Sequence, residues 1–250
     1  MIAWLGMYER PENAAAHDRF WSLIRARLGK GPKRLSRPCC GAGWSVWESP
    51  DLFLGQTCGL PYRTRLHGKV RLVGTLDHGL PHCPAGHYYS VIVVPRARAQ
   101  EMLGDVRSLR LAFNARISQS GWAAPVAWLQ ARGLVVSSTH ETGSHRLSAR
   151  AVAQGCADVA GLDALSWALM QRFDDVTDDL AVIAHTPPTP GLPCITAAHQ
   201  DPAPLFDAMQ HAIEALCAED RALLHLRGLV HISAAEYLAV ADPPIIQSAG

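Results

Sequence analysis

The sequence of 250 residues predicts an α/β protein with two lobes, each a mainly parallel sheet flanked by helices. After Pro95, short apolar stretches typical of strands alternate with amphipathic stretches typical of helices, which is the pattern of βαβ units. Before Pro95, short apolar strands are separated by loops rich in glycine and proline. The strands therefore form two groups, and the chain is expected to cross between them twice, near residues 91–95 and 184–190. The predicted lobes are residues 1–92 plus 187–250 for lobe I and residues 93–186 for lobe II.

The first part of the chain begins with a strand and a helix. The stretch MIAWLGMY predicts a strand that ends at Tyr8, and Pro11 opens a helix that continues to about Leu28. In that helix Phe20, Trp21, Ile24 and Leu28 share one face, so this face is expected to be buried. Three further strands are expected before the alternating part, over residues 51–57, 70–75 and 88–95.

The alternating part is more regular. Gly155 follows one of its expected helices as a C-cap glycine would. The expected strands are residues 109–114, 134–138, 157–162 and 180–186, and the expected helices are about residues 121–131, 144–154 and 163–172. A proline-rich crossing and a strand over residues 187–197 follow, and residues 202–226 supply one or two closing helices.

The charge balance argues against several classes of partner. Lys and Arg total 23 and Asp and Glu total 22, so the net charge of +1 gives no electrostatic reason to bind nucleic acid or an acidic membrane surface. No apolar run approaches the roughly 20 residues that cross a bilayer, so no membrane insertion is expected. We expect a monomer with no cofactor.

The cysteines and the N-terminal stretch bear on the compartment. The seven cysteines are odd in number and include the adjacent Cys39 and Cys40, which favours reduced thiols over a disulfide framework. The stretch MIAWLGMYERPENAAAHD lacks the basic, apolar and small-residue regions of a secretory leader. We therefore expect a cytoplasmic protein, or a periplasmic one if a leader precedes this numbering.

A cluster of small polar residues opens one expected helix. Ser118, Gln119, Ser120 and Gly121 lie between a strand and a helix, so their side chains and the N–H groups of Gly121 and Trp122 can converge on one oxyanion. The helix dipole adds partial positive charge at the same place. The alternative is that Ser120 is a simple N-cap and the rest is loop.

Two further helix starts carry side chains of similar chemistry. His145 follows Thr142, Gly143 and Ser144 at the start of the next helix, where a bound anion would favour the charged ring and the helix N-terminus the neutral one. Asp163 ends a strand and begins a helix, where it is either an N-cap or a carboxylate facing the ligand. In the second case it would admit a phosphate or phosphonate that carries an OH and repel fully ionised sulfate.

Lobe I offers candidates at the ends of its own strands. Tyr8 ends the first strand, and Thr57 follows the second in the stretch QTCGLPY. The carboxyl ends of strands are where α/β sheets place ligand groups. A buried tyrosine with a satisfied OH and an ordinary turn are the alternatives.

Six motifs together resemble one family. GMY, QTCGLPY, YYSVIVV, NARISQSGW, TGSHRLSARAVAQGCADVAGLDALSW and TPGLP resemble, in that order, the phosphonate-binding branch of the substrate-binding proteins of ABC importers. The resemblance implies the two-lobed type II periplasmic-binding-protein fold, with two hinge crossings and a small oxyanion of the phosphate, phosphite or phosphonate type trapped in the cleft between the lobes. It implies an ABC permease as partner. It also implies a ligand shell of Ser118, Ser120, Gly121, His145 and Asp163, with Tyr8, Thr57 and Tyr88 from lobe I.

Other functions stay open at this point. Ser120, His145 and Asp163 have the residue types of a catalytic triad, and Cys58 with a histidine would be another nucleophile, but no Gly-x-Ser-x-Gly elbow is present. We therefore expect no catalytic residues. A cytoplasmic oxyanion sensor is a further alternative. The loop with His78, His82, Cys83 and His87 has metal-ligand residue types, but Pro81 and Pro84 between them disfavour a metal site.

Overall fold

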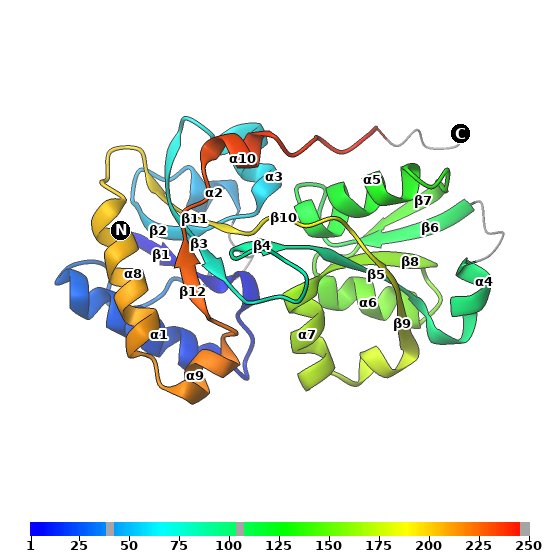
Figure 1. Ribbon diagram of the computed structural model, residues 1–250, viewed down its shortest axis with the longest axis horizontal. Coiled ribbons are helices and arrows are strands. Elements are labelled where there is room, and N and C mark those ends of the chain that lie inside the picture. Colours follow the sequence, from blue (N-terminus) through cyan, green and yellow to red (C-terminus); the bar gives the residue numbers. More distant parts are fainter. Residues whose placement is uncertain (39–42, 104–107, 246–250) are drawn as a thin grey trace. The chain divides into compact units, whose positions relative to one another are not determined.

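The computed structural model describes residues 1–38, 43–103 and 108–245, and the chain divides into two compact units (Figure 1). Unit 1 consists of Met1–His87 and Pro190–Val240, and unit 2 consists of Tyr88–Thr189 together with residues 241–245. The chain passes between the units within two short strands, β4 (His87–Tyr88) and β10 (Thr189–Pro190), which pair with each other, and once more after Val240. The assignment of ligand-binding lobes to residues 1–92 plus 187–250 and 93–186 stays a prediction.

Unit 1 is built on a five-stranded mixed sheet in the order β1-β2-β11-β3-β12. β1 and β2 are parallel, whereas β11 is antiparallel to both of its neighbours, β2 and β3, and β12 is antiparallel to β3. The strands are β1 (Ile2–Trp4), β2 (Leu52–Gln56), β3 (Val70–Asp77), β11 (Pro193–Ala197) and β12 (Gly228–Val230). The prediction of a mainly parallel sheet is wrong here, because the strand that follows the second crossing inserts between β2 and β3 in the opposite direction.

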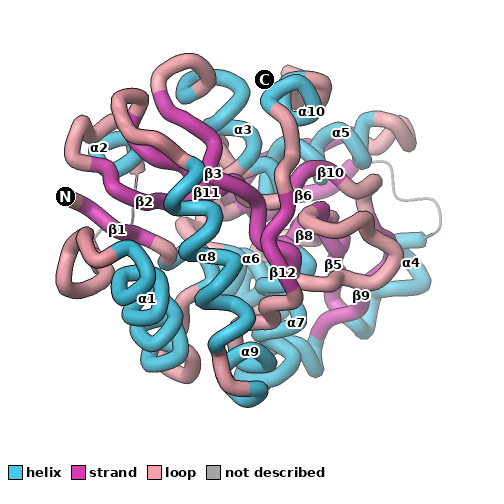
Figure 2. The backbone as a smooth tube through the Cα atoms, turned by 60° about the vertical axis from the view of Figure 1, so that its left-hand side comes forward, coloured by secondary structure: helices cyan, strands magenta, loops and turns pink. Residues whose placement is uncertain are grey.

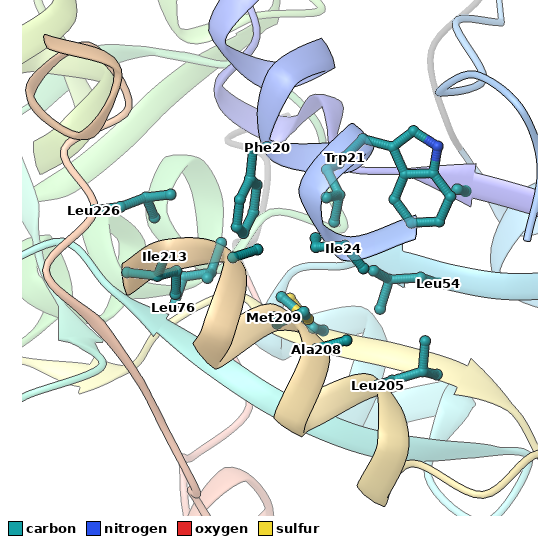
Figure 3. Close-up of a cluster of buried hydrophobic side chains, with 14 of the residues drawn as sticks. Phe20, Trp21, Ile24, Leu54, Leu76, Leu205, Ala208, Met209, Ile213 and Leu226 are labelled. Atoms are coloured by element: carbon teal, nitrogen blue, oxygen red, sulfur yellow. The ribbon is translucent and has the colours of Figure 1, made fainter. Parts of the chain in front are cut away.

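Helices cover both faces of this sheet. On one face α1 (Ala14–Leu28) and α8 (Ala203–Ala215) lie side by side (Figure 2) and bury a large apolar cluster against the strands. The predicted helix face is confirmed, since Phe20, Trp21 and Ile24 lie within this cluster and Leu28 packs against it (Figure 3). The shorter helices of the unit are α2 (Trp44–Trp47), α3 (Gly59–Pro61), a π-helical turn over Tyr62–Leu66, α9 (Ala218–Leu223) and α10 (Ala234–Leu238).

Unit 2 is also built on a five-stranded mixed sheet, in the order β7-β6-β8-β5-β9. β6 is parallel to β7 and β8, as the βαβ pattern predicted, but β5 is antiparallel to both β8 and β9. The strands are β5 (Ser90–Pro95), β6 (Ser108–Phe113), β7 (Val135–Glu141), β8 (Val159–Asp163) and β9 (Leu180–His185). β8 and β9 share a direction because both are antiparallel to β5, so the sheet is mainly parallel as predicted, except for β5, which enters between β8 and β9 from the first crossing and runs against the other strands.

The helices of unit 2 follow its parallel strands. β6 leads to a π-helical turn over Gln119–Ala123 and then α5, β7 leads to α6, and β8 leads to α7. The helices are α4 (Ala99–Leu103), α5 (Ala124–Gln130), α6 (His145–Ala153) and α7 (Ala164–Phe173), and 3-10 turns cover Arg96–Arg98 and Asp175–Asp179. Because β6, β7 and β8 run in one direction, the polar residues that follow them gather at one edge of the sheet.

The end of the first strand differs from the sequence prediction. The first strand ends at Trp4, and Gly6–Tyr8 form a 3-10 turn, so Tyr8 follows the strand by four residues instead of ending it. An added Cβ at Gly6 would lie 2.9 Å from the Trp4 indole nitrogen, so the turn folds tightly back on the strand end.

Two chain-wide predictions can be compared with the described residues. Cys58, Cys83, Cys156, Cys194 and Cys217 carry free thiols, while Cys39 and Cys40 lie outside the described residues. Among the helices within the described ranges, none combines the length and the apolar character that a membrane span requires.

Candidate functional site

Ser118 organises the turn that follows β6. It is the N-cap of the π-helical turn, and its hydroxyl accepts a hydrogen bond from the Gly121 N–H at 2.9 Å. The cap is therefore Ser118, whereas the capping alternative in the sequence named Ser120. Ser118 is 6% exposed. A serine hydroxyl that accepts one hydrogen bond still carries its own proton, so Ser118 can donate to an anion.

The amide groups expected to bind the anion are engaged within this turn. The Gly121 N–H donates to the Ser118 hydroxyl, and the Trp122 N–H donates to the Ser118 carbonyl oxygen at 3.2 Å. The Trp122 ring packs against Phe113 with ring centroids 4.5 Å apart and belongs to the apolar core of unit 2. Both N–H groups therefore have a partner within the turn, and their predicted role as contacts to a ligand stays a prediction. Gln119 is buried, and its role as a ligand contact stays a prediction.

Ser120 and His145 bring two helix starts together. The Ser120 hydroxyl oxygen lies 3.2 Å from His145 Nε2. His145 is the first residue of α6 and follows Ser144, whose hydroxyl caps the helix by accepting from the Leu147 N–H. An added Cβ on Gly121 would lie 3.1 Å from His145 Cε1, so the imidazole ring packs directly on the glycine backbone. The sequence prediction that the two clusters point to one edge is consistent with this contact.

Backbone hydrogen bonds fix the second turn to the end of β6. The Thr142 N–H donates to the Phe113 carbonyl at 2.8 Å, and the Gly143 N–H donates to the Asn114 carbonyl at 3.0 Å. Gly143 has a φ of 89°, which glycine adopts without strain. The position of His145 next to Ser120 therefore follows from the backbone geometry of both turns.

The environment of His145 favours the neutral ring. Burial lowers the pKa of His145 to about 4, and the Gly161 backbone beside the ring opposes this effect only in part. Nδ1 has no hydrogen-bond partner among the residues that the structure describes. Near neutral pH the ring therefore offers hydrogen bonds instead of a full positive charge.

Asp163 acts as the N-cap of α7. One carboxylate oxygen, Oδ1, accepts hydrogen bonds from the N–H groups of Leu165 at 2.8 Å and Ser166 at 2.9 Å. Asp163 is 2% exposed and pairs with Ser90 across β8 and β5. The Ser90 hydroxyl in turn donates to the Ser120 carbonyl at 2.8 Å. Asp163 and the Ser120 turn are thus connected through Ser90, while a role for Asp163 in ligand binding stays a prediction.

The three residues of the possible triad do not form a relay. In such a relay the acid accepts a hydrogen bond from Nδ1 of the histidine. His145 Nδ1 lacks a partner within the described ranges, and Asp163 Oδ1 is engaged by two amide groups of α7. The Ser120 and His145 pair therefore has the geometry of a hydrogen-bonding surface without the third member that would orient the base.

The remaining candidates, predicted for lobe I, are Thr57, Tyr8 and Tyr88. Thr57 follows β2 and is fully buried, and its hydroxyl has no hydrogen-bond partner in the described part of the chain. Tyr8 packs edge-on against His78, with ring centroids 5.2 Å apart. Tyr88 belongs to unit 2, lies in β4 at the first crossing and is 3% exposed.

Sequence reasoning did not single out Gln56. This residue ends β2, is 2% exposed, and its side-chain Nε2 has no hydrogen-bond partner among the described residues. The available signal was a carboxamide at the end of an otherwise apolar strand, directly before Thr57.

The histidine-rich loop shows no metal-binding arrangement in the part that the structure describes. No group of three His, Cys, Asp or Glu side chains is close enough there to hold a metal ion. His78 Nδ1 instead pairs with the His225 carbonyl at 3.1 Å, and His87 Nδ1 lies 3.2 Å from the Ala85 carbonyl. Burial raises the pKa of the Cys83 thiol to about 11, which disfavours the thiolate that a metal requires.

Comparisons with known proteins identify relatives. The family model described as "ABC transporter, phosphonate, periplasmic substrate-binding protein" matches residues 62–237. No curated protein sequence matches the chain significantly.

Solved structures with the same fold cover most of the chain. PhnD1 from Prochlorococcus marinus, in complex with methylphosphonate, is 16% identical with a TM-score of 0.70 over 92% of this chain and 91% of its own. A binding protein component of an ABC phosphonate transporter from Pseudomonas aeruginosa is 16% identical with a TM-score of 0.65 over 92% of this chain and 80% of its own. XAC2383 from Xanthomonas citri, bound to ATP, is 16% identical with a TM-score of 0.65 over 89% of this chain and 90% of its own. The predicted fold class, the two-lobed type II periplasmic-binding-protein fold, is confirmed.

The comparisons correct the predicted location. The matching family consists of periplasmic substrate-binding proteins, so the expectation of a cytoplasmic protein is wrong. That expectation depended on the cysteine count and on the first residues of the sequence. Neither feature contains information about the family, which is identified by residues 62–237. The family is also one of substrate-binding transport proteins and not of enzymes.

Proposed function

This chain belongs to the periplasmic substrate-binding proteins of phosphonate ABC transporters, and we propose that Ser118, Ser120 and His145 are the groups that first hold its oxyanion. The ligand of this proposal is a phosphate, phosphite or phosphonate type anion. The family implies a small ligand and a permease as partners. We further propose that the protein acts as a monomer and delivers the anion to the permease without chemical change.

One observation carries the residue assignment. The 3.2 Å contact between Ser120 Oγ and His145 Nε2 joins the turn after β6 to the start of α6. If Nε2 donates its proton to Ser120, the serine hydroxyl keeps its own proton for the ligand. Ser118, two residues earlier, has the same capacity because its hydroxyl accepts from Gly121. Two serine O–H donors beside a neutral imidazole suit an oxyanion.

Other groups complete the proposed ligand shell. In unit 1 the fully buried Thr57 hydroxyl has no partner in the described ranges, which supports its predicted role as a donor. Tyr8 and Tyr88 are proposed as further contacts, together with the Gln119 side chain. Asp163 is proposed to favour a ligand with an OH group on its phosphorus, because the carboxylate can accept a hydrogen bond from that OH. The same carboxylate repels a fully ionised anion.

The expected hydrogen bonds are sufficient for a micromolar dissociation constant. Hydrogen bonds to a charged group contribute about 1.5 to 3 kcal/mol each. Four or five of them, after the costs of ordering and closure, leave about 8 kcal/mol, which corresponds to micromolar binding. A neutral His145 lowers this sum compared with a charged one but avoids the cost of burying an extra charge.

Catalysis is not part of the proposal. His145 Nδ1 has no partner in the described part of the chain and Asp163 Oδ1 caps α7, and both observations support binding over nucleophile activation. A histidine whose pKa is lowered to about 4 is also a weak general base. Turnover of a phosphoester by the purified protein would contradict this part of the proposal.

A thermal-shift panel tests the proposed ligand class. Phosphate, phosphite and methylphosphonate are expected to raise the melting temperature of the wild-type protein, because each binds only the folded state. Sulfate and methanesulfonate are expected to have a much smaller effect at equal concentration. If none of the three phosphorus oxyanions raised the melting temperature, the proposed function would have to be abandoned.

A further inference from the structure

The carboxyl-terminal edge of the sheet in unit 1 holds buried polar groups that no part of the described chain satisfies. β1 is parallel to β2, and β2 and β3 share one direction because both are antiparallel to β11. The ends of β1, β2 and β3 therefore lie at one edge. Gln56 ends β2, and its Nε2 lacks a partner, as does the hydroxyl of the adjacent Thr57. The two residues are 2% and 0% exposed.

Residues that follow β1 and β3 contact each other across this edge of the sheet. Tyr8 follows β1 and His78 follows β3, and their rings are in contact with centroids 5.2 Å apart. In the sheet order β2 lies between β1 and β3, next to β11. The contact between Tyr8 and His78 therefore spans the edge at which the polar side chains of β2 end.

The backbone holds Gln56 and Thr57 firmly. The Gln56 carbonyl accepts from the Trp47 indole N–H at 3.0 Å, and Gln56 pairs with Cys194 of β11. The Thr57 N–H donates to the Pro193 carbonyl at 3.0 Å. These main-chain groups are thus satisfied, while the side-chain Nε2 of Gln56 has no partner among the described residues. A buried donor without a partner is costly, and proteins retain such groups where a ligand or a bound water satisfies them.

We propose that Gln56 is a ligand-binding residue whose side-chain N–H group donates to an oxygen of the phosphonate-type anion. A carboxamide gives this donor without adding positive charge, which matches the uncharged hydroxyl of Thr57 beside it. This inference depends on the proposed function, because the anion that Gln56 would bind is of the class which that function names. It goes beyond that function by assigning the anion a side-chain amide as donor, in addition to hydroxyl groups and groups at helix starts.

Two substitutions at Gln56 and one matched control test the assignment by calorimetric titration with methylphosphonate. Gln56→Met removes the donor and is expected to lower the affinity at least tenfold without lowering the melting temperature of the ligand-free protein, since no internal hydrogen bond is lost. Gln56→Glu keeps the shape but replaces the donor with a negative oxygen, so a loss of at least a hundredfold is expected. Gln56→Glu would instead retain affinity if the unpaired atom were an acceptor for a ligand OH.

Gln200 provides the control. It is not part of β2 but contacts Leu52, the first residue of that strand. Its Nε2 donates to the Leu52 carbonyl at 3.2 Å. Gln200→Met is therefore expected to lower the melting temperature and leave the methylphosphonate affinity unchanged, which is the opposite of Gln56→Met. Wild-type affinity in Gln56→Met or Gln56→Glu would overturn the assignment of Gln56 alone. A wild-type protein that bound none of the phosphorus oxyanions would overturn the proposed function and this assignment with it.

Discussion

Ser120 Oγ and His145 Nε2 lie 3.2 Å apart although 25 residues separate them in the sequence. The contact exists because β6 and β7 are parallel neighbours and each leads into a helix at the same edge of the sheet. It places a hydroxyl and an imidazole where they can share one ligand.

The pair Ser120→Ala and His145→Ala should remove ligand-induced stabilisation while leaving a folded protein. Wild-type protein with methylphosphonate at 100 times its dissociation constant should gain about 2.7 kcal/mol in the free energy of unfolding. The double variant should gain almost nothing, because both side chains of the contact are gone. The exposed pair Ser22→Ala and His211→Ala in unit 1 is the control and should respond as the wild type does. A melting-temperature shift that survived the first pair of changes would move the site elsewhere.

Asp163→Asn should separate the capping role from the electrostatic one. Asparagine keeps an oxygen for the N–H groups of Leu165 and Ser166, so the variant should remain folded. Removal of the charge should weaken the preference for methylphosphonate over methanesulfonate, as measured by calorimetry. Asp163→Ala should in addition lose about 1 kcal/mol of stability with the cap. Unchanged selectivity in Asp163→Asn would show that the carboxylate does not sense the ligand.

Gly121→Ala should damage both stability and binding. An added Cβ would overlap Asn114 Oδ1 and lie 3.1 Å from His145 Cε1, so the turn and the imidazole must shift. Overpacking of this kind costs about 1 to 3 kcal/mol in the free energy of unfolding. Gly228→Ala is the control, because its Cβ would meet nothing within 4 Å. Equal urea midpoints for the two variants would contradict the close approach at Gly121.

His17 on α1 should make the stability of the protein depend on pH. It is 8% exposed, neither ring nitrogen has a partner in the described residues, and burial, followed by the charge of Arg37, lowers its pKa from 6.5 to about 4. The unfolded ring therefore takes up a proton at higher pH than the folded one. The resulting stability is present above pH 6.5 and is lost as the pH falls toward 4.

His17→Gln should remove part of this pH dependence. At about 1.4 kcal/mol per pKa unit, protonation of His17 should lower the free energy of unfolding by about 3 kcal/mol between pH 6.5 and pH 4. The free energy of unfolding in urea should consequently fall less steeply with acidification in His17→Gln than in the wild type. Some dependence should remain, since burial lowers the pKa of His78 and His145 in the same direction. The same substitution at exposed His211 is the control, and a slope in His17→Gln equal to that of the wild type would exclude the effect.

Local patterns were enough to predict most elements and one part of the site. The buried face of α1 and the βαβ order of unit 2 follow from apolar spacing, which the chain carries locally. The Ser118 and His145 turns were found because small polar residues between a strand and a helix are visible in the sequence. The direction of β11 and β5 was not predictable in this way, since it depends on where the chain enters each sheet after a crossing.

The details of the site depend on contacts that a linear pattern does not contain. Which serine caps the turn, and whether the Trp122 N–H is engaged, are decided by the tight π-helical geometry after Ser118. Gln56 was overlooked because a polar residue at a strand end has no distinctive spacing, and only the absence of a partner in the folded chain marks it. The short elements α2, β12 and α10 escaped prediction because three to five residues give too little periodicity.

A crystal structure of the protein with methylphosphonate tests the assignment of Ser118, Ser120 and His145. We expect phosphonate oxygens at about 2.6 to 3.2 Å from the Ser118 and Ser120 hydroxyls, and a protonated phosphonate oxygen at a similar distance from His145 Nδ1, which accepts while Nε2 donates to Ser120. A phosphonate bound to other residues, with Ser120 and His145 still paired and more than a water layer away from it, would show that the site lies elsewhere.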